Sequence, residues 1–182
     1  LSRELATAYY KIGQIQGNSY YSNLGDTDGA MTSYLRSLEI RQRLSNADPS
    51  NPELRHELAD SLEGIGDMHY TVNDLEKGLE SYERAVAIRE RLILDDPENL
   101  DYKYSLAGVL GKRGDISGME GFPNLGDLPR ALESYRRGLA IYEEILKVSP
   151  NSEKYTSGYA TMLHFYGMLQ STSGDNIGAI EN

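Results

Sequence analysis

Few side chains in this 182-residue sequence could carry out catalytic or metal chemistry. The absence of cysteine excludes thiol nucleophiles, disulfides and iron–sulfur clusters. One of the three histidines, His56, stands four residues before Asp60, a spacing at which two ligands on one helix can share a metal ion. No second pair accompanies them, so the sequence predicts a solvated helix face there and no metal site.

Phosphate-binding and nucleophilic motifs are also missing from the sequence. The segment Gly111-Lys112-Arg113-Gly114 has two glycines around a basic pair, but the Lys-Ser or Lys-Thr of a Walker motif does not follow. No Ser–His–Asp set and no pair of carboxylates recurs along the chain. We therefore expect a protein that is not an enzyme and needs no cofactor.

The charge balance argues against nucleic acid as a partner. The chain has 18 Lys and Arg against 28 Asp and Glu, a net charge of -10, and such a chain repels phosphate backbones. No apolar run approaches the roughly 18 residues of a membrane span. The sequence thus predicts a protein partner, no nucleic acid and no membrane span. It leaves the compartment unknown; a cytoplasmic location is the favoured expectation and an extracellular one stays open.

Internal repeats define the elements that must position these residues. Four Leu-Ala or Tyr-Ala pairs are each followed by a glycine seven residues after the alanine. These glycines are Gly13, Gly66, Gly114 and Gly167. A second column holds Gly25-Asp26, Asn73-Asp74 and Gly126-Asp127, whose aspartates are 48 and then 53 residues apart. The repeats predicted from these columns are 1–48, 49–96, 97–149 and a partial fourth at 150–182.

The alternating spacing reflects a five-residue insertion in the first and third repeats, within segments 14–23 and 115–124. The larger unit is therefore a pair of repeats, 101 residues long. At this offset Lys11 and Ile15 meet Lys112 and Ile116. We interpret the pattern as the duplication of a two-repeat block.

Each repeat contains two amphipathic helical patterns. In the third repeat, apolar residues follow steps of four and three along one face: Leu128, Leu132, Tyr135, Leu139, Tyr142 and Leu146. The aspartates of the Gly-Asp column stand at the N-cap of this second helix. Glycine inside a helix costs about 1 kcal/mol relative to alanine, so the glycine column predicts close helix contacts, with tyrosine rings filling the space. The fold class predicted is all-α, an array of antiparallel helix pairs.

The repeat motifs resemble the tetratricopeptide repeat. Tyr9-x2-Ile12-Gly13 and Leu62-x2-Ile65-Gly66 match its first part, and Ala30-x3-Tyr34, Gly78-x3-Tyr82 and Ala131-x3-Tyr135 match its second. The period exceeds the family's 34 residues and is similar to that of kinesin-light-chain-type arrays and of the repeat regions in bacterial serine/threonine kinases. The resemblance implies a right-handed superhelical solenoid that serves as a non-catalytic protein interaction scaffold.

The resemblance also implies a concave groove lined by the first helix of each repeat. The positions it assigns to the groove are Tyr10, Gln14, Asp60, Glu63, Asp67, Asp115, His164 and Met168. The set has no Lys or Arg, so a basic or mixed peptide is expected and capture of an acidic tail is disfavoured. Alternatively, its carboxylates only keep an exposed helix face soluble.

Aromatic residues in the insertions and arginines on the second helices lead to two further expectations. Tyr20, Tyr21 and Phe122 lie in the insertions, where they either contact a partner or fold back over the helices. The second helices carry arginines that alternate with acids, a pattern that predicts a solvent-exposed helix face. These arginines are Arg36, Arg41, Arg43, Arg84, Arg89 and Arg91.

The two ends have apolar residues without polar capping repeats. They are Leu1, Leu5, Tyr9, Ile177 and Ile180. One expectation is a fragment of a larger signalling protein. The alternative is a self-assembling structural protein whose ends stack head-to-tail into a filament or ring.

Overall fold

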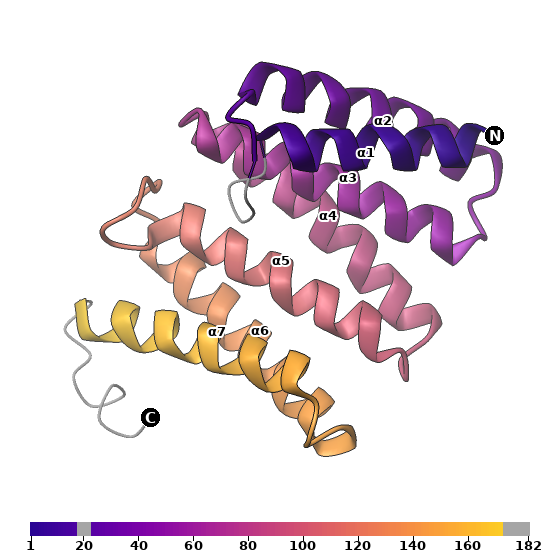
Figure 1. Cartoon of the computed structure of the whole chain (residues 1–182). Coiled ribbons are helices and arrows are strands. Elements are labelled where there is room, and N and C mark those ends of the chain that lie inside the picture. Colours follow the sequence, from indigo (N-terminus) through magenta and orange to yellow (C-terminus); the bar gives the residue numbers. More distant parts are fainter. Residues whose placement is uncertain (18–22, 173–182) are drawn as a thin grey trace. The chain divides into compact units, whose positions relative to one another are not determined.

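The chain is all-α in a computed structural model that describes residues 1–17 and 23–172 (Figure 1). Its helices are α1 (Ser2–Gly17), α2 (Thr27–Ala47), α3 (Pro52–Thr71), α4 (Leu75–Asp95), α5 (Leu100–Gly118), α6 (Leu128–Val148) and α7 (Glu153–Thr172). No strand occurs in these two described ranges. The predicted fold class, a tetratricopeptide-like array of helices, is confirmed.

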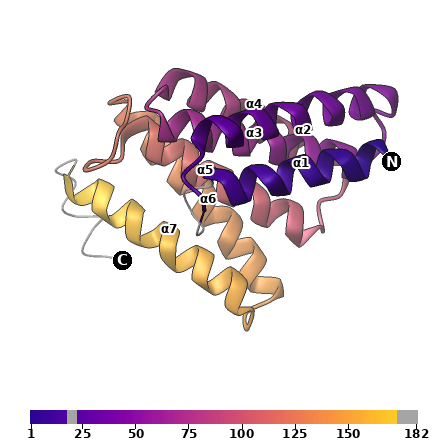
Figure 2. The same cartoon turned by 45° about the horizontal axis from the view of Figure 1, so that its top comes forward.

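The helices divide into two compact units, which are described separately. In unit 1, Leu1–Asp95, helix α1 packs on α2, α2 on α3, and α3 on α4. In unit 2, Asp96–Asn182, helix α5 packs on α6 and α6 on α7. Successive helices within each unit run antiparallel (Figures 1 and 2). We call α1, α3, α5 and α7 the A helices, and α2, α4 and α6 the B helices.

The glycine column makes room for tyrosine rings, as the sequence predicts. A Cβ built on Gly66 would lie 2.5 Å from the Tyr82 ring, and one built on Gly114 would lie 2.7 Å from the Tyr135 ring. The buried tyrosines of this column are at most 1% exposed. Glycine is thus required where α3 meets α4 and where α5 meets α6. Around Gly167 no described atom comes within 4 Å of such a Cβ.

The two insertions begin and end with the same hydrogen bonds, which supports the duplicated block. The Leu24 amide donates to the Ile15 carbonyl at 3.0 Å, and Leu125 donates to Ile116 at the same distance, 101 residues later. Equivalent bonds then lead into the N-cap residues of α2 and α6. The backbone enclosing each insertion is therefore built in the same way in both units.

The residue before each N-cap aspartate needs a left-handed backbone. Gly25 and Gly126 both have φ of 73°, and Asn73 has φ of 61°. Glycine adopts this region without a Cβ clash, and asparagine tolerates it better than most residues. This explains why the Gly-Asp column accepts Asn-Asp as a variant.

The aspartates that follow differ in their contacts. Asp26 and Asp127 accept hydrogen bonds from the Gly29 and Arg130 amides, as N-caps do. The Asp74 carboxylate instead lies 2.7 Å from the Lys77 ammonium. The short turn of the second repeat therefore starts its B helix with an ion pair.

Candidate interaction surface

A buried arginine of α4 holds two of the predicted groove carboxylates in unit 1. Arg89 is 2% exposed. Its Nη2 lies 2.9 Å from Asp60 Oδ1, and its Nη1 lies 2.5 Å from Glu63 Oε2. The two acids belong to α3 and keep 29% and 21% of their side chains exposed. They are therefore fixed acceptors at the edge of solvent.

The charge of Arg89 is stabilised by these partners. Burial lowers the pKa of Arg89, but the charges and hydrogen bonds of Glu63 and Asp60 together outweigh it and leave the pKa raised. The guanidinium therefore stays protonated at any pH at which the protein folds. Asp60 and Glu63 retain oxygen lone pairs for a further donor.

A second buried arginine, Arg41 of α2, lies between α1 and α3. It is 3% exposed, and its Nη1 donates to the Glu57 carbonyl at 2.7 Å and to Ser61 Oγ at 3.0 Å. Its guanidinium also lies over the Tyr10 ring, 4.8 Å from the centroid. Burial lowers the pKa of Arg41, while nearby acids oppose the shift. The arginine thus links the predicted groove residue Tyr10 to α3.

The two arginines correct one expectation. Arg36 and Arg43, and likewise Arg84 and Arg91, are exposed as the sequence predicts. Arg41 and Arg89 are buried, seven residues after the core tyrosines Tyr34 and Tyr82. Seven residues are close to two helical turns, so each arginine lies on the packing face with its tyrosine. The register of the tyrosine column could have identified them.

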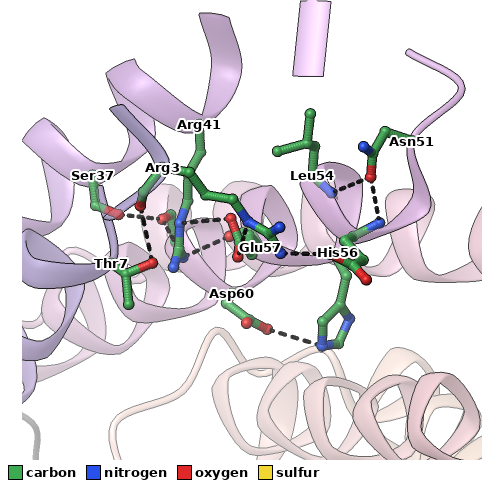
Figure 3. Close-up of polar contacts among 11 residues, drawn as sticks. Arg3, Thr7, Ser37, Arg41, Asn51, Leu54, His56, Glu57 and Asp60 are labelled. Carbon is green, nitrogen blue, oxygen red and sulfur yellow. Dashed lines mark hydrogen bonds and ion pairs between the residues drawn. The ribbon is translucent and has the colours of Figure 1, made fainter. Parts of the chain in front are cut away.

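Ion pairs continue along the same side of unit 1 (Figure 3). Arg3 of α1 pairs with Glu53 at 2.7 Å and with Glu57 at 2.9 Å, both on α3. His56 Nε2 lies 4.0 Å from Asp60 Oδ1. No group of three or more His, Asp or Glu residues that could hold a metal ion occurs in the described part of the chain. The His56–Asp60 pair thus borders an ion-pair network.

Two other predicted groove residues contact tyrosines of their own repeats. Asp67 is 4% exposed and accepts a hydrogen bond from the Tyr82 hydroxyl at 2.8 Å. Asp115 is half-buried and accepts a bond from the Tyr135 hydroxyl. These carboxylates connect an A helix to the B helix that follows it.

The remaining residues of the predicted groove lie on the first and the last described helix. Gln14 and Tyr10 are half-buried on α1, while His164 and Met168 are exposed on α7. The structure brings Tyr10 near α3 through Arg41, and it keeps His164 and Met168 in the other unit. An open depression of about 480 Å³ borders α1 and is lined by Arg3, Glu4, Thr7, Ala8 and Lys11.

Only some of the loop and end residues can be placed. Phe122 is 49% exposed. Leu1, which precedes α1, and Leu5 are exposed, and Tyr9 is half-buried. Tyr20, Tyr21, Ile177 and Ile180 lie outside the described residues.

The fold and the site define a helical-repeat protein whose helix contacts combine glycine–tyrosine packing with buried ion pairs. The family model of the tetratricopeptide repeat matches residues 19–53 and 58–98. These two stretches are tetratricopeptide repeats, as the sequence motifs predict. Its repeats indicate a protein interaction scaffold with protein partners, a class that is generally non-catalytic. The closer likeness to kinesin-light-chain-type and bacterial kinase repeats stays a prediction.

The crystal structure of MamA protein is similar over 96% of this chain and 95% of its own, at 15% identity and a TM-score of 0.25. A TM-score of that size does not establish a common arrangement of the two chains. No curated protein matches the sequence. Among the helices in the described ranges, none has the length and apolarity to cross a membrane.

Proposed function

We propose that this scaffold binds an extended peptide or partner protein along the exposed side of its A helices, and that the partner is basic or mixed in charge. The observation that carries the proposal is the Arg89 site. There Asp60 and Glu63 are oriented by a buried cation and still reach solvent. Acceptors fixed in advance lose little freedom when a ligand donates to them.

The charge distribution supports a basic or mixed segment. The eight predicted groove residues contain four acids and no Lys or Arg, and the net charge of the chain is -10. Arg89 neutralises part of this acidity, and α1 carries two further cations, Arg3 and Lys11. These cations favour a ligand that has some acids among its basic residues, because like charges placed opposite each other are unfavourable.

The test uses peptides of equal length that are lysine-rich, mixed lysine–glutamate, or glutamate-rich. Binding to the whole chain is measured by fluorescence anisotropy at low and high salt. We expect the lysine-rich and mixed peptides to bind and the glutamate-rich one not to bind, with affinity falling as salt rises. Tightest binding by the glutamate-rich peptide would reverse the charge assignment, and no binding by any peptide would argue against the proposed surface.

A matched pair of variants locates the binding surface. Thr7 on α1 and Thr32 on α2 each donate their hydroxyl to the carbonyl four residues earlier, at 3.0 Å and 2.9 Å. Thr7→Lys adds a positive charge to the A-helix side, and Thr32→Lys adds one to a B helix. We expect Thr7→Lys to weaken the lysine-rich peptide roughly fivefold and Thr32→Lys to change it less than about twofold. Equal effects would mean that binding depends only on net charge.

A further inference from the structure

An ammonium group lies between two tyrosine rings and a carboxylate in unit 2. The Lys154 Nζ of α7 lies 4.2 Å from the ring centroid of Tyr104 on α5 and 5.3 Å from that of Tyr155 on α7. The same nitrogen donates a hydrogen bond to Asp101 Oδ1 on α5 at 2.9 Å. Aromatic faces and a carboxylate both attract a cation. We call Asp101, Tyr104 and Tyr155 the ammonium site.

The rings of this site are held in place by the core of unit 2. The centroids of Tyr104 and Tyr155 are 5.5 Å apart, and the Tyr104 ring meets the buried Tyr142 ring edge-on at 6.0 Å. Both rings pack on the core cluster that includes Tyr142. The site is therefore preformed, and its aromatic faces do not depend on the lysine for their position.

The lysine, in contrast, is held at the surface. Its side chain is 50% exposed, and that of Asp101 is 73% exposed. Surface ion pairs contribute little to stability, because ordering two side chains offsets much of the attraction. Burial lowers the pKa of Lys154, but the hydrogen bond and charge of Asp101 oppose it and the pKa is raised, so the group is charged at neutral pH. The site thus holds a cation that a second cation can replace.

The fold does not require rings at the contact between two A helices. At the α1–α3 contact, 101 residues earlier, Arg3 and Glu53 stand where unit 2 has Tyr104 and Lys154, and a leucine replaces the second ring. Arg3 and Glu53 close that contact with an ion pair at 2.7 Å. The rings of unit 2 therefore add a cation-binding property that helix packing alone does not explain.

The ammonium site lies on the side of the A helices that the proposed peptide uses. On α5, Asp101 and Tyr104 stand 14 and 11 residues before the predicted groove residue Asp115. On α7, Lys154 stands 14 residues before Met168, another predicted groove residue. These separations are close to whole numbers of helical turns, so the residues of each helix share one face.

We propose that the ammonium site binds a lysine side chain of the basic or mixed segment, in competition with Lys154. The inference rests on the proposed function and names the side chain that unit 2 recognises. Lys154 is a built-in competitor, because it uses the same rings and the same carboxylate. It lowers the apparent affinity of the site according to the fraction of chains in which it is bound there.

The carboxylate makes the site selective for an unmodified lysine. A trimethylated lysine keeps its charge and its attraction to the rings, but it has no N–H group to donate to Asp101. We expect a peptide with trimethylated lysines to bind about threefold or more weakly than the unmodified lysine-rich peptide. Tighter binding of the trimethylated peptide would overturn the role of Asp101.

The first experiment removes the competitor. Binding of the lysine-rich peptide to the whole chain is measured by fluorescence anisotropy, and Lys154→Ala is compared with Lys147→Ala. Both variants remove one positive charge from unit 2, but Lys147 is exposed on the B helix α6 and is not part of the site. We expect Lys154→Ala to tighten binding about threefold or more and Lys147→Ala to change it less than about 1.5-fold. Equal tightening would mean that only net charge matters and would overturn the site.

A double-mutant cycle tests the competition. Asp101→Asn in the natural chain should change the affinity little, because the peptide and Lys154 lose the same acceptor. In the Lys154→Ala chain it should cancel most of the gain. Glu120→Gln removes an exposed acid beyond the end of α5 and should have the same small effect in both chains. An equal effect of Asp101→Asn in both chains would overturn the competition.

The outcomes separate this inference from the proposed function. Peptide binding that does not respond to Lys154→Ala would overturn the ammonium site and leave the proposed function standing. Binding to the Lys154→Ala chain but not to the natural chain would support the site and contradict the proposed function. Absence of binding to either chain would overturn both.

Discussion

The α2–α3 contact of unit 1 and the α6–α7 contact of unit 2 are the same helix pair, 101 residues apart, with opposite chemistry. In unit 1 the contact is polar: Arg41, Ser37, Ser61 and Glu57 form its hydrogen bonds. In unit 2 the residues at these positions are Tyr142, Gly138, Met162 and Gly158. There the contact is made by an aromatic ring and a thioether packed against two glycines.

The substitutions compensate one another in size. A Cβ on Gly158 would lie 2.5 Å from the Tyr142 hydroxyl, so glycine is needed where unit 1 has Glu57. Met162 fills the space opposite Gly138, where unit 1 has two serines. Helix packing constrains the total volume at a contact more strongly than its polarity. One backbone arrangement can therefore hold either a buried charge or an aromatic cluster.

The contacts between A helices, α1–α3 in unit 1 and α5–α7 in unit 2, also differ in chemistry. Arg3 pairs with Glu53 in unit 1, whereas Tyr104 and Lys154 stand at these positions in unit 2. The Lys154 ammonium lies 4.2 Å from the Tyr104 ring centroid. Lys154 also pairs with Asp101 of α5 at 2.9 Å. Unit 2 therefore keeps a salt bridge here, adds a cation–π contact, and carries the cation on the other helix. Unit 1 therefore relies on ionic partners in these contacts, whereas unit 2 combines one ion pair with aromatic rings.

Exchanging the central residues should have the largest effect. Tyr142→Arg places a charge beside Gly158 and Met162, where no acid replaces Glu57, so we expect a loss of about 3 kcal/mol or more in the free energy of unfolding. Urea denaturation followed by circular dichroism measures it. Adding Gly158→Glu should recover part of the loss. A tolerated Tyr142→Arg would mean that the aromatic contact is not specific.

The two buried arginines should differ from each other. Arg89→Met leaves Asp60 and Glu63 without their buried cation, and we expect a loss of about 2–3 kcal/mol. Arg41→Met should cost less, about 1–2 kcal/mol, because Glu57 keeps its ion pair with Arg3. Denaturation midpoints of the two variants under one set of conditions decide the order. The reverse order would show that the backbone carbonyl and Ser61 depend on Arg41 more than the carboxylates depend on Arg89.

The glycine column should give effects of opposite sign. Gly114→Ala pushes a methyl group against the buried Tyr135 ring, and we expect a net loss of about 1–2 kcal/mol. Gly167→Ala meets no described atom within 4 Å and should gain up to about 1 kcal/mol from helix propensity. The thermal unfolding midpoints of the two variants, compared with that of the natural chain, measure both effects. A loss at Gly167 would indicate a packed neighbour at that position.

The starts of the B helices should show the smallest effects. Asp127→Ala removes an N-cap and should cost about 1 kcal/mol, whereas Asp74→Ala removes solvent-accessible contacts with Lys77 and His69 and should cost less. Lys77, and His69 to a lesser degree, lower the pKa of Asp74. Its contribution is therefore present at neutral pH and lost as the pH falls through that lowered pKa. Asp74→Asn should remove this acid-side dependence in denaturation curves taken over a pH series.

The sequence alone determined the helices, the repeat register and the glycine–tyrosine contacts. These follow from patterns local to one helix or repeated at a fixed spacing: the periodicity of apolar residues, the cap aspartates and the recurrence of Gly66 and Gly114 with Tyr82 and Tyr135. Column positions also predicted the two matching insertions. Such features could be inferred because neighbouring repeats impose the same requirement on the same position.

Only the tertiary structure decided which partners the buried charges have and which apolar residues stay exposed. The tyrosine register marks the helix face of Arg89, but its acids lie 26 and 29 residues away on another helix. Ile12 and Ile65 occupy the same register, yet Ile12 is 44% exposed and Ile65 is 5% exposed, because α2 covers only the second. A helix pattern specifies which side of a helix can pack, whereas the neighbour that reaches that side determines what the residues there do.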